Sequence, residues 1–324
     1  MTRVMITGVG AIIGYGLIRS LRASSQPSWI LGADIYPDAV GQAWCDSFEQ
    51  APLTADEAYL EWLARVVEKH RIDLLIPGIE QDVYRLSDDR DVIKRLGCRV
   101  ALNPKRLLDL ARDKWLMDRE LVRLEEPSRI PSSIDGDYSR LSEALGLPFI
   151  VKPRRSTASK GFARVEDRVS FERAIEVLGS TFIAQSAVGN NEDEYTVGVF
   201  GDGEGNVHAS ITLKRRLARD GSTARAWVRQ IDTLDETVLR LCRHFKPLGP
   251  ANLQFRLHQD EWKFLEINPR ISSSSSIRTA FGYNEASMCV DFYLHERSPR
   301  QPKIGEGFAV RFIEDHVVHA RDHF

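Results

Sequence analysis

Cysteine is scarce in this 324-residue sequence, and the four cysteines lie far apart. Cys45, Cys98, Cys242 and Cys289 form no C-x-x-C pair, which argues against a zinc site and against a disulfide framework. Dispersed single cysteines are typical of reduced, mostly buried thiols. We therefore expect a cytoplasmic protein.

The sequence also lacks an excess of charge of either sign and any long apolar run. Lys plus Arg number 44 and Asp plus Glu number 46, so the formal net charge is −2. A protein that binds nucleic acid usually carries a basic field, and this balance argues against that role. No apolar run approaches the roughly 20 residues of a membrane span. The first residues do not form a signal peptide.

No Gly-Lys dipeptide occurs, which excludes a P-loop, but a glycine turn follows the first expected strand. Its glycines Gly8, Gly10 and Gly14 have the spacing G-x-G-x-x-x-G, one residue longer than the usual dinucleotide fingerprint. Asp34 lies 20 residues after Gly14, where a ribose-binding acid would sit. We favour a turn that serves another ligand or only packing, with NAD(P) binding by an oxidoreductase as the alternative.

Strand and helix patterns alternate over the first hundred residues. Strands are expected at 3–7, 29–33, 72–77 and 98–102, and helices at 12–21, 56–70 and 81–96. Such alternation indicates a parallel sheet with helices on its faces. Right-handed crossovers then give a Rossmann-like half-domain, which we place at residues 1–103.

The second part of the chain, residues 104–324, has a different pattern, mainly antiparallel and α+β. One helix is expected from Asn103 to Trp115, followed by a connection rich in Pro, Ser, Asp and Gly over 127–136. Strands are expected at 149–152, 161–166, 181–185, 194–200 and 207–214, and helices at 170–178 and 232–245. We divide this part into subdomains at 104–188 and 189–324.

The segment from Asn252 to Arg270 predicts a hairpin that carries oxygen ligands. Pairing of its two strands places Gln254 and Glu266 on adjacent rungs, and Glu266 and Asn268 share one face. Oxygen ligands on one face suit Mg²⁺, and the fork of Arg270 suits a phosphate oxygen. The alternative is an amphipathic hairpin with a solvated polar face.

Lys152 ends another apolar strand and precedes a small, hydroxylated and basic loop that runs to Gly161. A loop of this composition can fold over phosphates through backbone N–H groups and cations. The alternative is an exposed hairpin turn.

Several motifs occur in the order and spacing of the ATP-grasp enzymes. They are Pro148-Phe-Ile-Val-Lys152-Pro, Ser159-Lys-Gly161-Phe, Gln185-Ser-Ala-Val188-Gly, Glu194-Tyr-Thr-Val and Glu266-Ile-Asn268-Pro-Arg270, with Asp113-Lys114 before them. From about residue 104 to 300 the chain resembles the branch that contains carbamoyl phosphate synthetase large-subunit domains and the ligase of pyrrolysine biosynthesis. The resemblance implies an α/β and α+β fold class, in which a Rossmann-like pre-ATP-grasp domain precedes the ATP-grasp fold.

The resemblance also implies which residues bind ATP. They are Lys114, Lys152, Ser159, Lys160, Gly161, Gln185, Ser186, Ala187, Val188 and Glu194. The lysines would meet the phosphates, Gln185 to Val188 the adenine, and Glu194 the ribose. Gln185 stands where several relatives carry Glu. The loop before Gly161 has no other glycine but contains two arginines, so an anionic substrate is a second candidate ligand of this loop.

The metal and substrate residues follow from the same resemblance. Gln254, Glu266 and Asn268 would hold Mg²⁺ or Mn²⁺, with Arg270 and Lys152 as the catalytic residues. The candidate substrate residues are Glu80, Arg154, Ser272, Ser273 and Arg278. Glu80 and its neighbour Asp82 could instead cap a helix, and the run 272–276 of five serines could be a mobile loop.

A ligase activity is the function that the resemblance implies: ATP activates a carboxylate as an acyl phosphate, which an amine then attacks. The expected partners are a small carboxylate and an amine, with a homodimer as an open option and with neither nucleic acid nor membrane. A phosphotransferase of the same fold and a nucleotide-binding module without catalysis are the alternatives.

Overall fold

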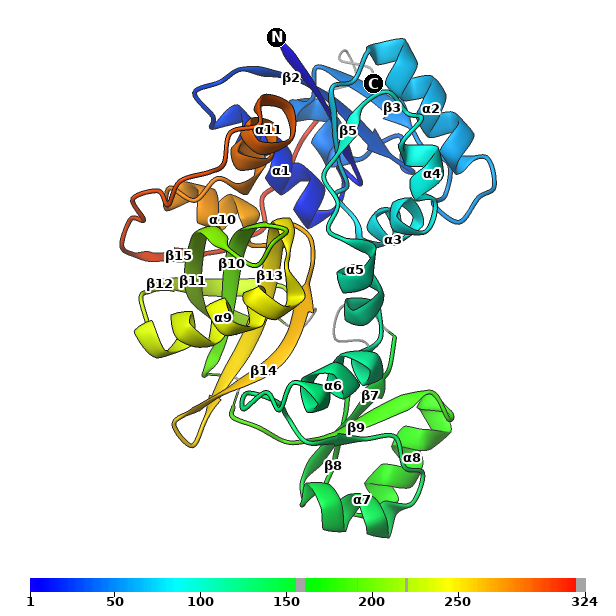
Figure 1. Ribbon diagram of the computed structural model, residues 1–324. Coiled ribbons are helices and arrows are strands. Elements are labelled where there is room, and N and C mark those ends of the chain that lie inside the picture. The colour runs from blue at the N-terminus through cyan, green and yellow to red at the C-terminus, as the bar shows by residue number, and fades with distance from the viewer. Residues whose placement is uncertain (156–160, 191, 219–220, 319–324) are drawn as a thin grey trace.

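The computed structural model describes residues 1–155, 161–190, 192–218 and 221–318 (Figure 1). These residues form three β-sheets that are flanked by helices. Within the described ranges, no helix combines the length and the apolar character that a membrane span requires. Ser159 and Lys160, two of the expected ATP-binding residues, lie outside the described residues.

The N-terminal sheet is parallel and has five strands in the order β3-β2-β1-β4-β5. Their bounds are β1 Thr2–Thr7, β2 Ser28–Asp34, β3 Ser47–Gln50, β4 Leu74–Ile76 and β5 Arg99–Val100. Sequence patterning identified all but β3, which is short and only half-buried. The parallel sheet predicted for this domain is present.

Helices cover both faces of this sheet. They are α1 (Ile12–Arg22), the 3-10 helix η1 (Val40–Trp44), α2 (Tyr59–His70), α3 (Glu80–Asp88) and α4 (Arg90–Ile93). Met5 of β1 packs toward α2 and α3, and its neighbours Val4 and Ile6 pack toward α1, as the alternation of a strand requires. The single helix expected at 81–96 is wrong, because the chain breaks at Asp89.

Two helices, α5 (Lys105–Arg112) and α6 (Lys114–Arg123), replace the single helix expected from Asn103 to Trp115. Asp113 has an extended backbone, and its carboxylate accepts hydrogen bonds from the backbone N–H groups of Trp115 and Leu116, at 3.0 and 3.4 Å. Asp is a preferred N-cap residue. The break therefore starts a new helix whose first residue is Lys114.

A small antiparallel sheet with the strand order β6-β9-β7-β8 follows these helices. Its strands are β6 Ser132–Ser133, β7 Phe149–Pro153, β8 Ala163–Val165 and β9 Phe182–Ser186. The helices α7 (Tyr138–Leu145) and α8 (Arg168–Leu178) cover it through a core that includes Phe149 and Phe171. Sequence patterning predicted α8 but not α7.

The largest sheet has six strands in the order β14-β13-β10-β11-β12-β15 and is antiparallel. Its strands are β10 Glu194–Asp202, β11 Val207–Leu217, β12 Thr223–Arg229, β13 Leu248–His258, β14 Glu261–Asn268 and β15 Phe308–Val310. Helix α9 (Asp232–Phe245) matches its predicted range and packs on the face that carries Val197 and Val199. Strands β12 and β15 were not predicted.

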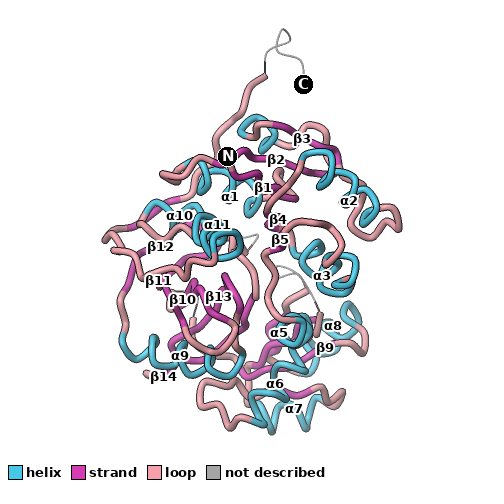
Figure 2. The backbone as a smooth tube through the Cα atoms, turned by 45° about the horizontal axis from the view of Figure 1, so that its top comes forward, coloured by secondary structure: helices cyan, strands magenta, loops and turns pink. Residues whose placement is uncertain are grey.

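Two unpredicted helices, α10 (Ser275–Ala280) and α11 (Glu285–His295), lie on the other face of the six-stranded sheet. Helix α11 also packs on the N-terminal sheet, where Ala286, Cys289 and Val290 share a core with Ile6 and Ile76. In Figures 1 and 2, α11 lies beside α1. The domain boundary at residue 103 stays a prediction. Helix α11, although it comes late in the chain, completes the core around the N-terminal sheet.

Candidate active site

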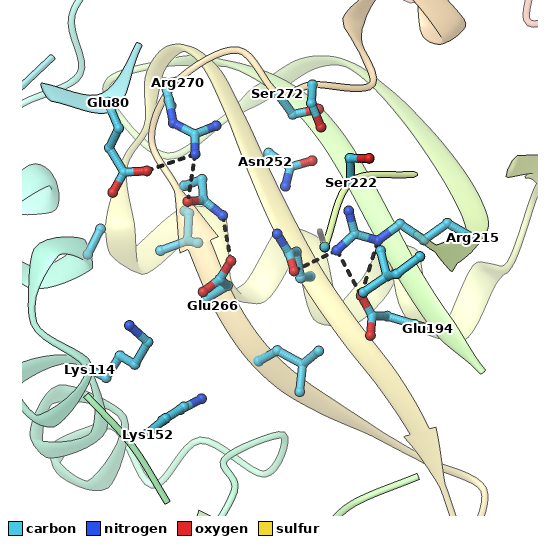
Figure 3. Close-up of a pocket in the computed structure, with 18 of the residues that line it drawn as sticks. Glu80, Lys114, Lys152, Glu194, Arg215, Ser222, Asn252, Glu266, Arg270 and Ser272 are labelled. Carbon is cyan, nitrogen blue, oxygen red and sulfur yellow. Dashed lines mark hydrogen bonds and ion pairs between the residues drawn. The ribbon is translucent and has the colours of Figure 1, made fainter. Parts of the chain in front are cut away.

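A cavity of about 500 Å³ lies between the two antiparallel sheets and beside the loop that follows β4 (Figure 3). Thirteen of the sequence-predicted residues line it, and they come from all three sheets or the segments next to them. They are Glu80, Lys114, Lys152, Gln185, Ser186, Val188, Glu194, Gln254, Glu266, Asn268, Arg270, Ser272 and Ser273. The structure therefore brings together residues from both predicted domains.

The β13–β14 hairpin forms as predicted, with its turn at Gln259 and Asp260. Gln254 pairs with Glu266 in the strand register, and the Asn268 side-chain amide donates a hydrogen bond of 2.9 Å to Glu266 Oε1. Burial alone would raise the pKa of Glu266. The hydrogen bond from Asn268 and the charges of Lys114, Lys152 and Arg215 outweigh burial and hold that pKa below its usual range.

The donor set of this hairpin suits a hard cation that takes its remaining ligands elsewhere. Within the described ranges, no group of three or more His, Cys, Asp or Glu side chains is placed so that it could hold a metal ion. The predicted ligands on the hairpin are one carboxylate, Glu266, and two amides. Mg²⁺ is commonly held by one or two carboxylates together with substrate phosphates and water. Glu266 fits this pattern as the carboxylate ligand. The amide oxygens of Gln254 and Asn268 already accept hydrogen bonds, from Arg215 at 2.7 Å and from Arg270 at 3.3 Å.

Two lysines face this hairpin from the opposite wall of the cavity (Figure 3). Lys152 lies on β7, and Lys114 is the first residue of α6, where Asp113 fixes the start of the helix. Burial lowers the pKa of Lys152, the charge of Glu266 opposes this shift, and the charges of Lys114 and Arg256 add to it, so that the pKa lies at about 8. An anionic ligand between the walls would stabilise both ammonium groups.

Arg270 pairs with Glu80 rather than standing alone at the end of β14. Its Nη2 donates to Glu80 Oε2 at 2.9 Å and to Asn268 Oδ1 at 3.3 Å. The helix-capping alternative for Glu80 and Asp82 is wrong, because Ile79 is the N-cap residue of α3 and no side chain caps this end. Glu80 instead ties the N-terminal domain to the oxygen-ligand hairpin.

Glu194 lies between two arginines that sequence patterning did not identify. The strand registers pair it with Arg215 on β11 and with Arg256 on β13. Arg215 donates to Glu194 Oε1 at 2.8 Å, and Arg256 donates to Oε2 at 2.9 Å. Both arginines line the cavity. Any ribose hydroxyl that binds Glu194 therefore meets a carboxylate whose two oxygens already accept hydrogen bonds.

Arg154 and Arg278, expected to contact substrate, do not line the cavity. Arg154 turns to Asp113, to which it donates at 2.8 Å. Arg278 is completely buried beneath β10 and pairs with Glu285 at 2.9 Å. A Cβ at Gly198 would lie 2.5 Å from its guanidinium, so the glycine makes room for this side chain. The expectation for Arg278 is wrong, because this side chain is completely buried and pairs with Glu285. A substrate role for Arg154, which pairs with Asp113, stays a prediction.

The run of serines folds into a turn and the first residues of a helix. Ser272 and Ser273 line the cavity, Ser274 and Ser275 are buried, and α10 begins at Ser275. Two expected nucleotide residues, Ala187 and Gly161, do not line the cavity. Gly161 has a φ of 79°, a conformation that glycine adopts without strain.

An apolar slot extends the cavity between the two walls. It is lined by Ile130, Ile150, Val188, Leu265 and Ile267. At its edge the Gln185 side-chain amide donates a hydrogen bond of 2.8 Å to the Ser132 hydroxyl. Ser186 also lines the cavity, and its hydroxyl donates to the Leu145 carbonyl at 2.9 Å. A flat, mainly apolar ring would fit between these side chains.

Sequence comparison identifies two kinds of relative. The family model described as "ATP-grasp in the biosynthetic pathway with Ter operon" matches residues 190–316. The carbamoyl phosphate synthase large chain of Methanothrix thermoacetophila is 26% identical over 263 residues, which are 72% of this chain and 24% of that protein. The chain therefore spans about a quarter of the length of this relative.

Structural comparison extends the likeness to almost the whole chain. N5-Carboxyaminoimidazole synthetase from Staphylococcus aureus, complexed with ADP, has a TM-score of 0.74 and 16% identity, covering 94% of this chain and 80% of that one. An L-amino acid ligase from Bacillus licheniformis has a TM-score of 0.70 and 16% identity, covering 91% and 74%. These matches confirm the predicted fold class.

Proposed function

We propose that the chain is an ATP- and Mg²⁺-dependent carboxylate–amine ligase of the ATP-grasp superfamily, which its sequence and structural relatives support. Its carboxylate substrate would be small, such as an amino acid, a peptide or a sugar acid. One observation carries the proposal: Lys114 and Lys152 face Glu266 and Asn268 across a single cavity. We also propose a cytoplasmic location, which the four free thiols support.

Nucleotide binding divides between the two walls of the cavity. The apolar slot would take the adenine ring, and the two lysines would bind the phosphates. Glu266 and Asn268 would hold Mg²⁺, which neutralises phosphate charge when it is bound. Glu266 suits this role because its pKa lies below the usual range, so the side chain stays anionic.

The proposed reaction has two steps, and neither needs a protein nucleophile. A carboxylate oxygen of the substrate attacks the γ-phosphorus of ATP, the bond to ADP breaks, and an acyl phosphate forms. A neutral amine then attacks the acyl carbon, phosphate leaves, and the amine loses one proton to solvent. Arg270 would stabilise the transferring phosphoryl group, because its planar fork matches two phosphate oxygens. The Glu80–Arg270 pair must then share this guanidinium with the substrate.

Hydroxylamine trapping tests the first step directly. A panel of amino acids, dipeptides and uronic acids is incubated with Mg·ATP and hydroxylamine, and hydroxamate and ADP are both measured. We expect hydroxamate with the carboxylate alone, and phosphate release with the same carboxylate plus its amine. A stable phosphorylated product that no amine consumes would instead identify a phosphotransferase.

Substitution of Arg270 separates the proposed ligase from a module that only binds nucleotide. Arg270→Lys keeps the positive charge but loses the planar fork, so we expect turnover to fall by roughly 10-fold or more. Binding of Mg·ADP, which lacks the transferring group, should change little. Equal turnover of this variant and the unchanged protein would contradict the role of Arg270.

A further inference from the structure

A second cavity, of about 620 Å³, lies in the N-terminal domain next to the candidate active site. It is formed by residues at and after the carboxyl ends of β1, β2 and β4, the edge at which open α/β sheets bind ligands. The two cavities share Ala11, Ile79 and Gln81 in their linings. A ligand in the second cavity can therefore extend toward the active site.

The second cavity carries three carboxylates, Asp34, Asp38 and Asp82. Among the described residues that line it there is no lysine, arginine or histidine. Asp34 and Asp82 are only 7% and 2% exposed. A buried carboxylate without a cationic partner is costly, so this lining favours a positively charged ligand and disfavours a phosphate or a second carboxylate.

Neutral donors hold the two buried carboxylates in place. Asp34 accepts hydrogen bonds from the backbone N–H groups of Gly10 at 2.8 Å and Tyr36 at 3.1 Å. Asp82 accepts one of 2.6 Å from the Thr54 hydroxyl. These bonds orient the carboxylates without neutralising them. Burial raises the pKa of Asp82, and the nearby charge of Asp34 raises it further, which a cation would reverse.

Most of the remaining lining is apolar and includes Ile35, Ala39, Val40 and Leu53. An apolar body with one cationic end matches this combination of surfaces. We infer that the second cavity binds an alkylammonium group of a substrate, whose reacting end extends past Ile79 and Gln81 to the active site. The assignment to a substrate rests on the proposed function, whereas the ammonium site itself depends only on the cavity.

Binding of three matched six-carbon probes tests the charge preference without any turnover. Hexylamine, hexanol and hexanoate are titrated by calorimetry into the full-length protein saturated with Mg·ADP, which keeps the probes out of the nucleotide site. We expect hexylamine to bind at least 10-fold more tightly than hexanol, and hexanoate to bind most weakly. Equal affinity for hexylamine and hexanol, or tighter binding of hexanoate, would overturn the inference.

Two variants and one control locate the binding site of the amine. Asp82→Asn and Asp34→Asn keep an oxygen acceptor but remove a charge, so each should weaken hexylamine binding at least 10-fold and leave hexanol binding unchanged. Glu57→Gln removes one charge from an exposed residue outside this lining and should change neither. Unchanged hexylamine affinity in both aspartate variants would overturn the site. If either variant is unstable, the relative affinities of the three probes for the unchanged protein still test whether the cavity prefers an ammonium group.

Turnover assays separate this inference from the proposed function and identify the substrate that carries the ammonium group. More hydroxamate from 6-aminohexanoate than from hexanoate would assign the site to the carboxylate substrate. Faster phosphate release with hexane-1,6-diamine than with hexylamine would assign it to the amine. Hexylamine binding without any acyl phosphate from the whole panel would overturn the ligase while supporting the ammonium site. Ligase turnover in a protein that binds hexylamine no more tightly than hexanol would support the ligase and overturn the ammonium site.

Discussion

The two walls of the active-site cavity differ in how they hold their charges. The four-stranded side presents two cations, Lys152 on a strand and Lys114 at the start of a helix. The six-stranded side presents Glu194 and Glu266 within networks, in which arginines and amides fix each carboxylate. The lysine wall therefore offers positive charge to a ligand, whereas arginines and amides hold the carboxylates of the other wall in place before a ligand binds.

This difference indicates that one wall mainly binds the nucleotide and the other mainly stabilises the transition state. Cations suit the binding of a ground-state nucleotide, because its phosphates carry their negative charge before the reaction begins. Fixed dipoles and charges are most valuable where charge develops in the transition state, because they need no reorganisation at that moment. We therefore expect substitutions on the lysine wall to change affinity and substitutions on the carboxylate wall to change rate.

The largest effect is expected beneath the carboxylate wall, where Arg278 and Glu285 are both completely buried. Arg278 also donates hydrogen bonds to the side chains of Thr196 and Asn252, so its removal takes a donor from two residues of the six-stranded sheet. Arg278→Met should reduce the free energy of unfolding by about 3–5 kcal/mol, because Glu285 keeps a buried charge without its partner. Urea denaturation measures this change. The double variant Arg278→Met/Glu285→Met should be less destabilised than the single one, and the opposite order would contradict the explanation.

On the carboxylate wall itself, Glu266→Gln should lower kcat at least ~100-fold, a loss typical of one strong electrostatic stabiliser. The variant keeps the shape and one ligand oxygen but removes the charge that attracts Mg²⁺. The Kd for nucleotide should change much less, since both lysines remain. Steady-state assays and calorimetry with Mg·ADP measure the two quantities. Near-normal turnover would show that the hairpin has only a structural role.

On the lysine wall, Lys152→Ala should weaken nucleotide binding by about 10-fold, the loss of roughly 1.4 kcal/mol of interaction with the phosphates. Turnover at low ATP should fall with it. Calorimetric titration with Mg·ADP gives the affinity, and Lys152→Arg serves as the control that keeps a cation. A fall in kcat at saturating ATP without any loss of affinity would break the comparison between the walls.

The smallest effect is a pH dependence of nucleotide affinity. The pKa of Lys152 is lowered to about 8, so this side chain loses its positive charge as the pH rises through that value. Affinity for Mg·ADP should therefore decline between pH 7 and pH 9.5, by no more than the loss in Lys152→Ala. Lys152→Arg stays charged over this range, and its affinity should stay level. A parallel decline in both proteins would assign the titration to another group.

Local pattern was enough to predict much of the fold and much of the oxygen-ligand hairpin. The alternation around β1, the range of α9 and the pairing of Gln254 with Glu266 all follow from periodicity and turn residues close in sequence. The short strands β3 and β15 carry too few residues for a periodic signal. Helix α7 follows the connection predicted at 127–136, and its eight residues are too few for a clear periodic signal.

The ladder Arg215–Glu194–Arg256 was missed for a different reason. In the sequence, Arg215 lies 21 residues and Arg256 lies 62 residues after Glu194. Only the register of three neighbouring strands brings these side chains together. The burial of Arg278 is a tertiary property as well, since its partner Glu285 belongs to a helix that the sequence did not reveal. Charge pairs set by strand register and helix packing cannot be derived from spacing alone.

The position of α11 has a consequence for the order in which the protein folds during synthesis. Helix α1 covers only part of one face of the N-terminal sheet, and Ala286, Cys289 and Val290 of α11 complete the same core. A ribosome makes these residues long after the five strands have emerged. Part of the apolar face of the first domain therefore stays uncovered until residue 290 has been translated, and chaperones can bind such a transiently exposed surface.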